Sequence, residues 1–113
     1  MSEFDPERFE DKYVHYFTEL QEAYRHAFER MNERYDSTLI HAIDQQVLNE
    51  SEPFYERGEG GPFAGEFRID LPPNPYERLD GVVVERERFD AILEEYVDEL
   101  RAQHRRVFGF EER

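Results

Sequence analysis

Residues 5–35 read DPERFEDKYVHYFTELQEAYRHAFERMNERY, and this stretch decides the expected architecture. Asp5 can accept the N-cap hydrogen bond and Pro6 suits the first helical position, so a helix should begin here. Apolar side chains then recur every three or four residues, and no Gly or Pro interrupts them before Tyr35. We therefore predict one long helix over residues 6–35. Its apolar stripe consists of Phe9, Tyr13, Phe17, Leu20, Tyr24, Phe28 and Met31, supported by Tyr16, Ala23 and Ala27.

The remaining chain predicts two more helices around a region of short strands. Asp36 and Ser37 offer a second N-cap, and the apolar spacing that follows predicts a helix over residues 37–49. Helical spacing returns over residues 86–107 and leaves a short tail at 108–113. This order is that of an α+β protein, which we expect to form a single domain over residues 1–113.

Residues 53–85 have the composition of a small antiparallel sheet. Apolar and charged residues alternate over 67–71, which is typical of a half-buried strand, and Pro72, Pro73 and Pro75 end it. Residues 54–56 and the β-branched run at 81–85 are the other candidates. We therefore expect two or three strands.

The charge balance indicates adaptation to salt. The chain has 28 Asp and Glu against 14 Lys and Arg, which gives a net charge of −14, and Lys12 is its one lysine. In about 1 M salt the Debye length falls to roughly 3 Å, so repulsion between carboxylates is screened. We interpret the chain as halophilic; an acidic protein of an ordinary cytoplasm is the alternative.

Composition also excludes several classes of site. The absence of cysteine excludes thiolate nucleophiles and cysteine-ligated metals. No run approaches the ~20 apolar residues needed to cross a bilayer, and the first residues do not resemble a signal peptide, so we expect no membrane association and a cytoplasmic location. Arg101, Arg105 and Arg106 form a local basic stretch, but they complement a helix C-terminus, and the net charge disfavours nucleic acid.

A row of possible metal ligands lies on the first predicted helix. His15, Glu19, Glu22 and His26 share one face at spacings of four, three and four. This face points away from the apolar stripe and therefore to solvent, whereas metal sites in helical bundles project inward. We predict no metal site, and the glycines at 58–65 match neither a dinucleotide nor a phosphate-loop pattern, so we predict no cofactor.

His104 is the one histidine placed beside an apolar stripe. It lies between Leu100 and Phe108, where burial could shift its pKa. A packing role is the simpler interpretation, since no serine is placed to complete a triad with it. His41 is expected on an exposed flank.

Three blocks carry a resemblance: YVHYF at 13–17, HAIDQQVLNESEPFY at 41–55 and RVFGF at 106–110. The chain resembles, from about Phe4 to Phe110, a family of short, acidic haloarchaeal proteins classed as a domain of unknown function. The stretch 60–65 looks longer than the usual turn of that family. The resemblance implies lineage and compartment, but it transfers no role to any residue.

Function is therefore unknown from the sequence, and two hypotheses remain. The first is a non-enzymatic interaction or structural module, because no inward-facing catalytic set is evident. The alternative is a small enzyme or ligand binder, with a pocket between helices and sheet that involves His104 and tyrosines.

We also expect a homodimer. A helix of about 30 residues spans about 45 Å, whereas a domain of this size has a radius of gyration near ~13 Å, so one end should overhang and expose rings. A second copy could cover them through the first helix. The alternative is a kink near Thr18 or Asn32 that folds the helix over its own sheet.

Overall fold

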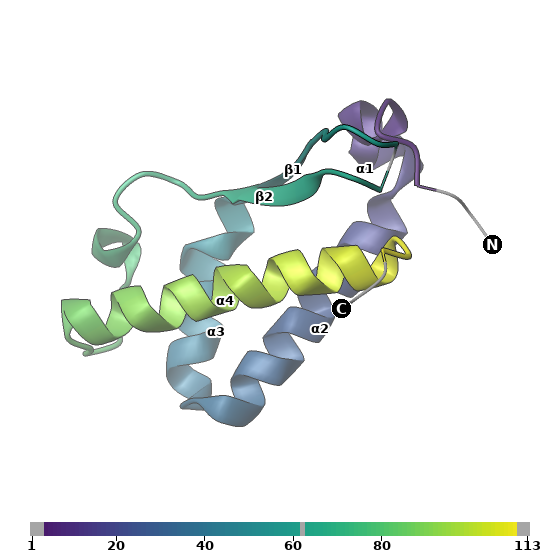
Figure 1. Ribbon diagram of the computed structural model, residues 1–113. Coiled ribbons are helices and arrows are strands. Elements are labelled where there is room, and N and C mark those ends of the chain that lie inside the picture. Colours follow the sequence, from purple (N-terminus) through teal and green to yellow (C-terminus); the bar gives the residue numbers. More distant parts are fainter. Residues whose placement is uncertain (1–3, 62, 111–113) are drawn as a thin grey trace.

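The computed structural model describes residues 4–61 and 63–110, and in that part an α+β arrangement is confirmed (Figure 1). The three longest helices and one β-hairpin make up most of this part of the chain. The α-helices are α1 (Lys12–His15), α2 (Phe17–Arg34), α3 (Ser37–Gln46) and α4 (Arg86–Val107). The strands are β1 (Glu52–Glu56) and β2 (Glu66–Asp70), and short 3₁₀ helices are η1 (Arg8–Asp11), η2 (Leu48–Glu50) and η3 (Tyr76–Arg78).

The predicted helix over 6–35 is not continuous, which corrects the sequence-based expectation. It divides at Tyr16, whose φ and ψ of −131° and 23° are not helical. The Tyr16 ring is buried against Phe4, Phe9 and Phe108, and its hydroxyl accepts a hydrogen bond of 3.0 Å from the Asp5 backbone N–H. The backbone therefore leaves the helical conformation at the residue whose ring is buried among side chains from both ends of the chain. The break lies two residues before Thr18, one of the two kink positions considered.

The other helices lie close to their predicted bounds. Asp36 caps α3 by accepting a hydrogen bond from the Leu39 N–H at 3.1 Å. The predicted helix 37–49 ends earlier, at Gln46, and continues as η2. The last helix, predicted over 86–107, is α4 with the same bounds. In the part of the chain that is described, no helix is both long enough and apolar enough to cross a membrane.

Helix α4 packs along α2 and forms the main core with α3 (Figure 1). Two alanines of α2, Ala23 and Ala27, have no exposed surface. Small side chains at these positions let the two helix backbones approach closely. The core between the helices is mostly aliphatic and also holds two aromatic side chains of α4, Phe89 and Tyr96.

Strands β1 and β2 form an antiparallel hairpin in which Tyr55 is opposite Phe67. The hairpin requires Gly65, because a Cβ there would lie 1.9 Å from the Glu56 carbonyl oxygen. The run 81–85 is not a strand, so the sheet has two strands in the described residues. Val83 is fully exposed, and the Val84 carbonyl accepts a hydrogen bond from the Tyr76 hydroxyl at 2.6 Å. This bond ties the run to η3 instead of to a neighbouring strand.

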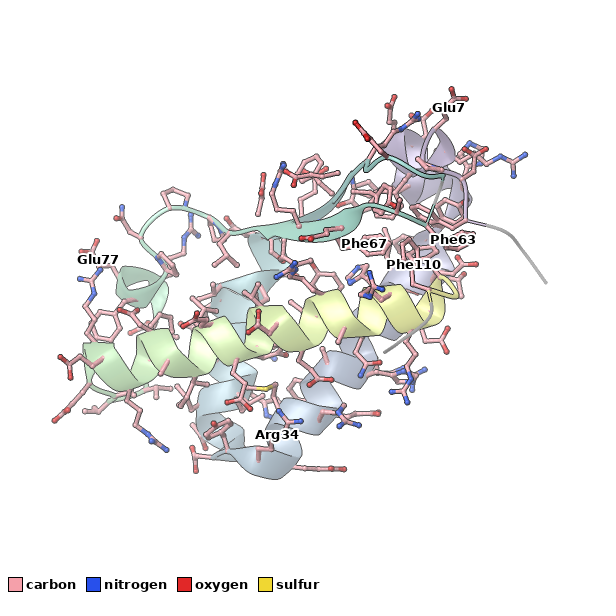
Figure 2. All side chains as sticks on the ribbon, viewed as in Figure 1. Glu7, Arg34, Phe63, Phe67, Glu77 and Phe110 are labelled. Atoms are coloured by element: carbon pink, nitrogen blue, oxygen red, sulfur yellow. The ribbon has the colours of Figure 1, made fainter. Side chains whose placement is uncertain are left out.

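A second core of aromatic rings joins the two ends of the chain. Figure 2 shows Phe63, Phe67 and Phe110 gathered at the C-terminal end of α4. The Phe110 ring lies 4.9 Å from Phe63 and 5.2 Å from Phe67, between ring centroids. The aromatic-rich interior expected from the composition is thus concentrated in one cluster, which contains Phe4, Phe9, Tyr16, Leu20, Phe67, Phe108 and Phe110.

Candidate functional site

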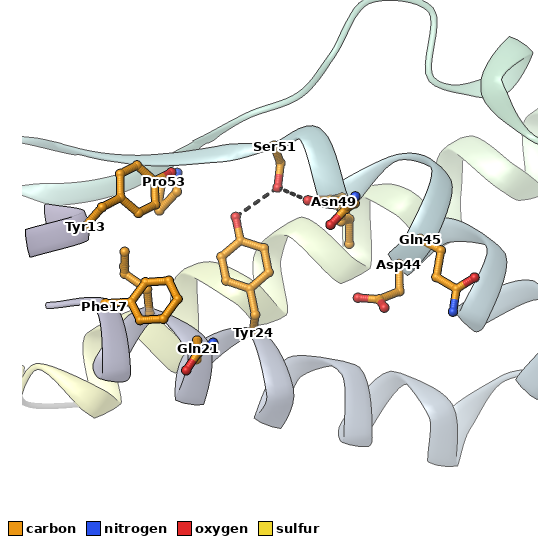
Figure 3. A pocket seen from close by; sticks show the side chains of 11 residues that line it. Tyr13, Phe17, Gln21, Tyr24, Asp44, Gln45, Asn49, Ser51 and Pro53 are labelled. Atoms are coloured by element: carbon orange, nitrogen blue, oxygen red, sulfur yellow. Dashed lines mark hydrogen bonds between the residues drawn. The ribbon is translucent and has the colours of Figure 1, made fainter.

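A groove of about 510 Å³ opens between α2 on one side and α3, η2 and the start of β1 on the other (Figure 3). Its apolar end is formed by rings at the junction of α1 and α2. Tyr13 is 54% exposed and Phe17 is 51% exposed, and Pro53 lies at the same end. The full lining is Tyr13, Phe17, Leu20, Gln21, Tyr24, Asp44, Gln45, Leu48, Asn49, Ser51 and Pro53.

The middle of the groove holds a hydroxyl pair, Tyr24 and Ser51, whose oxygens are 2.9 Å apart (Figure 3). Ser51 donates its one hydroxyl proton to the Leu48 carbonyl at 2.6 Å. The Tyr24 hydroxyl must therefore be the donor to Ser51. Burial raises the pKa of Tyr24 to about 12, so this phenol stays protonated and keeps that direction. Ser51 is held as an acceptor and is not poised as a nucleophile.

The polar end of the groove contains a partly buried carboxylate, Asp44. Burial raises the pKa of Asp44, and the neighbouring His41 opposes this shift. Within residues 4–61 and 63–110, Asp44 has neither a hydrogen bond nor an ion pair through its carboxylate. The buried hydroxyl of Tyr96 lies near this end. It has no hydrogen-bond partner in the same part of the chain, and burial, followed by the charges of Asp44 and Tyr24, raises its pKa.

Next to the apolar end, Lys12 is buried in a cage of aromatic rings. Its Nζ lies 2.9 Å from a carboxylate oxygen of Glu52 in β1. The same atom is 4.6 Å from the Phe54 ring centroid, 5.2 Å from that of Tyr13 and 5.5 Å from that of Phe9. Sequence reasoning missed this site. The available signal was composition, since one lysine stands among thirteen arginines.

His104 lies outside the groove, and its side chain has no exposed surface. Its Nδ1 donates a hydrogen bond of 2.7 Å to the Leu100 carbonyl, so the neutral ring presents Nε2 as an acceptor. That Nε2 is buried and has no partner among the described residues. The ring packs at 5.6 Å from Tyr24 and 5.5 Å from Phe67. Burial lowers the pKa of His104 to about 4, which keeps it neutral.

The row of possible metal ligands is divided by the break at Tyr16. His15 belongs to α1, whereas Glu19, Glu22 and His26 belong to α2, so the single face assumed for the row does not exist. In the described residues, no group of three or more His, Cys, Asp or Glu side chains could hold a metal. His41 is exposed, as expected, and its ring packs edge-on against Phe28 at 4.9 Å.

The basic stretch near the end of α4 is used within the fold. Arg101 donates a hydrogen bond of 2.9 Å to the Phe67 carbonyl and another of 3.1 Å to Glu66. It therefore fastens α4 to β2. Arg105 lies over the Phe110 ring at 5.1 Å.

Comparison with known proteins assigns a family and no activity. No curated protein and no solved structure matches the chain. The model of a family of unknown function, DUF5783, matches residues 1–111, which is nearly the whole sequence. The chain therefore belongs to the DUF5783 family.

Proposed function

We propose that this chain is a non-enzymatic interaction module that binds a partner in the groove beside α2. The observation that carries the proposal is the exposure of Tyr13 and Phe17 at the mouth of the groove. Half-exposed aromatic side chains at the edge of a groove form an apolar surface patch, and such patches usually mark a binding surface. Among the described residues Phe63 is the one other exposed phenylalanine or tyrosine ring, and it packs against Phe4 and Phe110.

The polar groups near the groove support binding more than catalysis. Ser51 gives its proton to a backbone carbonyl, and Tyr24 is held protonated by burial. His104, the strongest candidate base in the sequence, is sealed behind the groove and has a lowered pKa. Nucleophilic catalysis requires a nucleophile within hydrogen-bond reach of a base, and these residues do not supply that arrangement.

The setting we propose is a salt-rich haloarchaeal cytoplasm. The net charge of −14 supports it, as does the use of arginine in exposed ion pairs. Arg34, for example, bridges Glu95 at 2.7 Å and Glu99 at 3.5 Å on the surface between α2 and α4. Such pairs contribute little individually in dilute buffer, so the surface is better explained by hydration in salt.

A small-ligand binder is the second candidate, because about 510 Å³ lies within the ~300–1,000 Å³ typical of small-molecule sites. The ligand-binding pocket expected from the sequence involved His104 and tyrosines; the groove contains Tyr13 and Tyr24 but not His104. Native mass spectrometry of protein purified from its host would then show a small added mass. A protein without added mass would favour the interaction module.

We also keep the homodimer as a proposal, with a different motive. The break at Tyr16 removes the overhanging helix, since α2 has 18 residues. The remaining support is the exposed run Tyr13, Val14 and Phe17, of which Val14 is 79% exposed. Light scattering in molar salt tests it: a mass near 13.7 kDa rules the dimer out, and twice that mass supports it.

Affinity capture from host lysate at molar KCl tests the module. We expect Phe17→Asp to abolish capture of the wild-type partner, because the change places a charge at the apolar end of the groove. Val83→Asp is the matched control, since Val83 is fully exposed and lies outside the groove. Circular dichroism should show all three proteins folded. Equal capture by both variants would refute the proposal that the groove is the binding surface.

A further inference from the structure

We propose that the groove receives an arginine or lysine side chain and a neighbouring apolar residue from a peptide segment of a partner protein. The inference rests on the proposed function and names the chemistry of the partner. It follows from one carboxylate, from the rings at the opposite end, and from the distance between them (Figure 3).

The first step is the charge of Asp44. Removing a carboxylate from water is unfavourable unless hydrogen bonds or an opposite charge replace its hydration. Asp44 is partly buried, and its carboxylate has neither a hydrogen bond nor an ion pair in the described part of the chain, where only the more distant charge of His41 opposes the effect of burial. Among the described residues that line the groove, none is cationic and Asp44 is the one charged group. A cation entering the groove would supply the missing counter-charge.

The second step is a comparison with Lys12. This ammonium is buried between Glu52 and three aromatic rings, all contributed by the chain itself. A carboxylate together with ring faces holds a desolvated cation by charge and by cation–π attraction. The adjacent groove has a carboxylate and exposed rings, but no cationic side chain lines it in residues 4–61 and 63–110.

The third step concerns length. Phe17 and Tyr24 are seven residues apart on α2, which corresponds to about 10 Å along the helix axis. Asp44 lies at the end of the groove opposite Phe17 (Figure 3). One side chain cannot satisfy both ends, but a basic residue near Asp44 and an apolar neighbour near Phe17 can. The amides of Gln21, Gln45 and Asn49 lie along the groove and can hydrogen-bond to a peptide backbone.

Charge also selects among occupants. Nucleic acid presents phosphates, which supply no counter-charge to Asp44. A basic peptide segment is attracted. Because Asp44 is partly buried, salt screens this attraction less than it screens pairs on the open surface.

The test is an NMR titration of the labelled full chain in about 1 M KCl, where the Debye length is about 3 Å. The probe is acetyl-Phe-Gly-Arg-amide, and the matched ligand replaces arginine with neutral citrulline. We expect the arginine peptide to shift the backbone signals of Tyr24, Asp44 and Ser51 and to bind about tenfold more tightly than the citrulline peptide. Asp44→Asn should remove that tenfold preference, whereas Glu87→Gln, an exposed acid outside the groove, should keep it.

The outcomes separate this inference from the proposed function. Equal affinity of both peptides at the groove would overturn the cationic occupant and leave the groove as the binding surface. No groove shifts with either peptide would also overturn the inference, and capture unaffected by Phe17→Asp would then overturn the function as well. A dimeric mass with the Tyr13 and Phe17 signals lost at the interface would show that a second copy covers the groove, which also overturns the peptide.

Discussion

The buried ring of His104 should make folding sensitive to acid. It has no exposed surface, and the groups packed against it, Tyr24, Phe67 and Phe108, are uncharged. Protonation would place a positive charge in this aromatic core without a counter-charge. His104→Phe keeps an aromatic ring of similar size and removes the titrating group, so it isolates the effect.

The magnitude follows from the two pKa values of His104, about 4 when folded and about 6.5 when unfolded. Between these values the unfolded chain binds a proton that the folded protein does not bind. The free energy of unfolding therefore rises with pH across this window, and it is lost as the pH falls from about 6.5 to about 4. At about 1.36 kcal/mol per pH unit, the loss reaches about 3 kcal/mol at the lower end of the window.

The assay is urea unfolding in molar KCl, followed by circular dichroism at about pH 7 and about pH 4.5. Protonation of carboxylates changes stability in every variant, so the informative quantity is the difference between proteins. Wild type should lose about 2 to 3 kcal/mol more than His104→Phe over this range. His15→Gln, which changes an exposed histidine, should behave as wild type. Equal pH dependence of wild type and His104→Phe would refute the reasoning.

Further changes test the salt adaptation, the Lys12 cage, the helix contact and the metal prediction. Diluting KCl from molar to about 0.1 M should lower the helical signal and the melting temperature, because the Debye length grows to about 10 Å; unchanged values would contradict a halophilic surface. Lys12→Ala should lower the free energy of unfolding by about 2 kcal/mol in urea melts, since it removes a buried stem and its contacts with three aromatic rings. Ala27→Leu should cost about 1 to 3 kcal/mol in the same melts, because Ala27 has no exposed surface and lies in the core shared with α4, while an unchanged midpoint would disprove tight packing there. Chelation should leave stability unchanged, and a stoichiometric transition metal in untagged protein would contradict the prediction for the row at 15–26.

The sequence predicts the helices whose bounds depend on local features, such as apolar spacing and capping residues. Helix α4 follows from uninterrupted apolar spacing, and the start of α3 follows from the cap at Asp36. The run 81–85 has high β-propensity, yet it forms no strand. The carbonyl of Val84 instead accepts a hydrogen bond from the Tyr76 hydroxyl of η3. Strand pairing depends on which chain segments meet, and propensity alone does not contain that information.

The groove could not be predicted for the same reason. Its two walls come from α2 and from the α3 to β1 segment, whose separation is set by packing. The sequence-based pocket joined His104 to tyrosines, and the structure does pack His104 against Tyr24, but it does not place His104 in the groove. Tyr13 and Tyr24 line the groove, whereas His104 is enclosed in the core.

The groove depends on which side chains of residues 9–31 are buried in the core. Size favoured the large rings at 13, 17, 24 and 28 as the core face. The structure buries a set of residues about one position away, which crosses the break at Tyr16 and shares Phe9, Leu20 and Met31 with the predicted stripe. That set is Phe9, Lys12, Tyr16, Leu20, Ala23, Ala27 and Met31. Of the large rings, Tyr24 and Phe28 are partly buried against the core, whereas Tyr13 and Phe17 are exposed.

The buried set is favoured because its small members let helices meet. Ala23 and Ala27 allow α4 to lie directly against α2, and large rings at those positions would hold the two backbones apart. With the alanines of α2 buried, Phe17 on the same helix faces solvent and is half exposed, and Tyr13, on α1 beyond the break at Tyr16, is half exposed beside it. The exposed end of the groove is therefore a consequence of close packing between α2 and α4. A surface created in this way keeps its aromatic rings without loss to the core, which leaves them available for a partner.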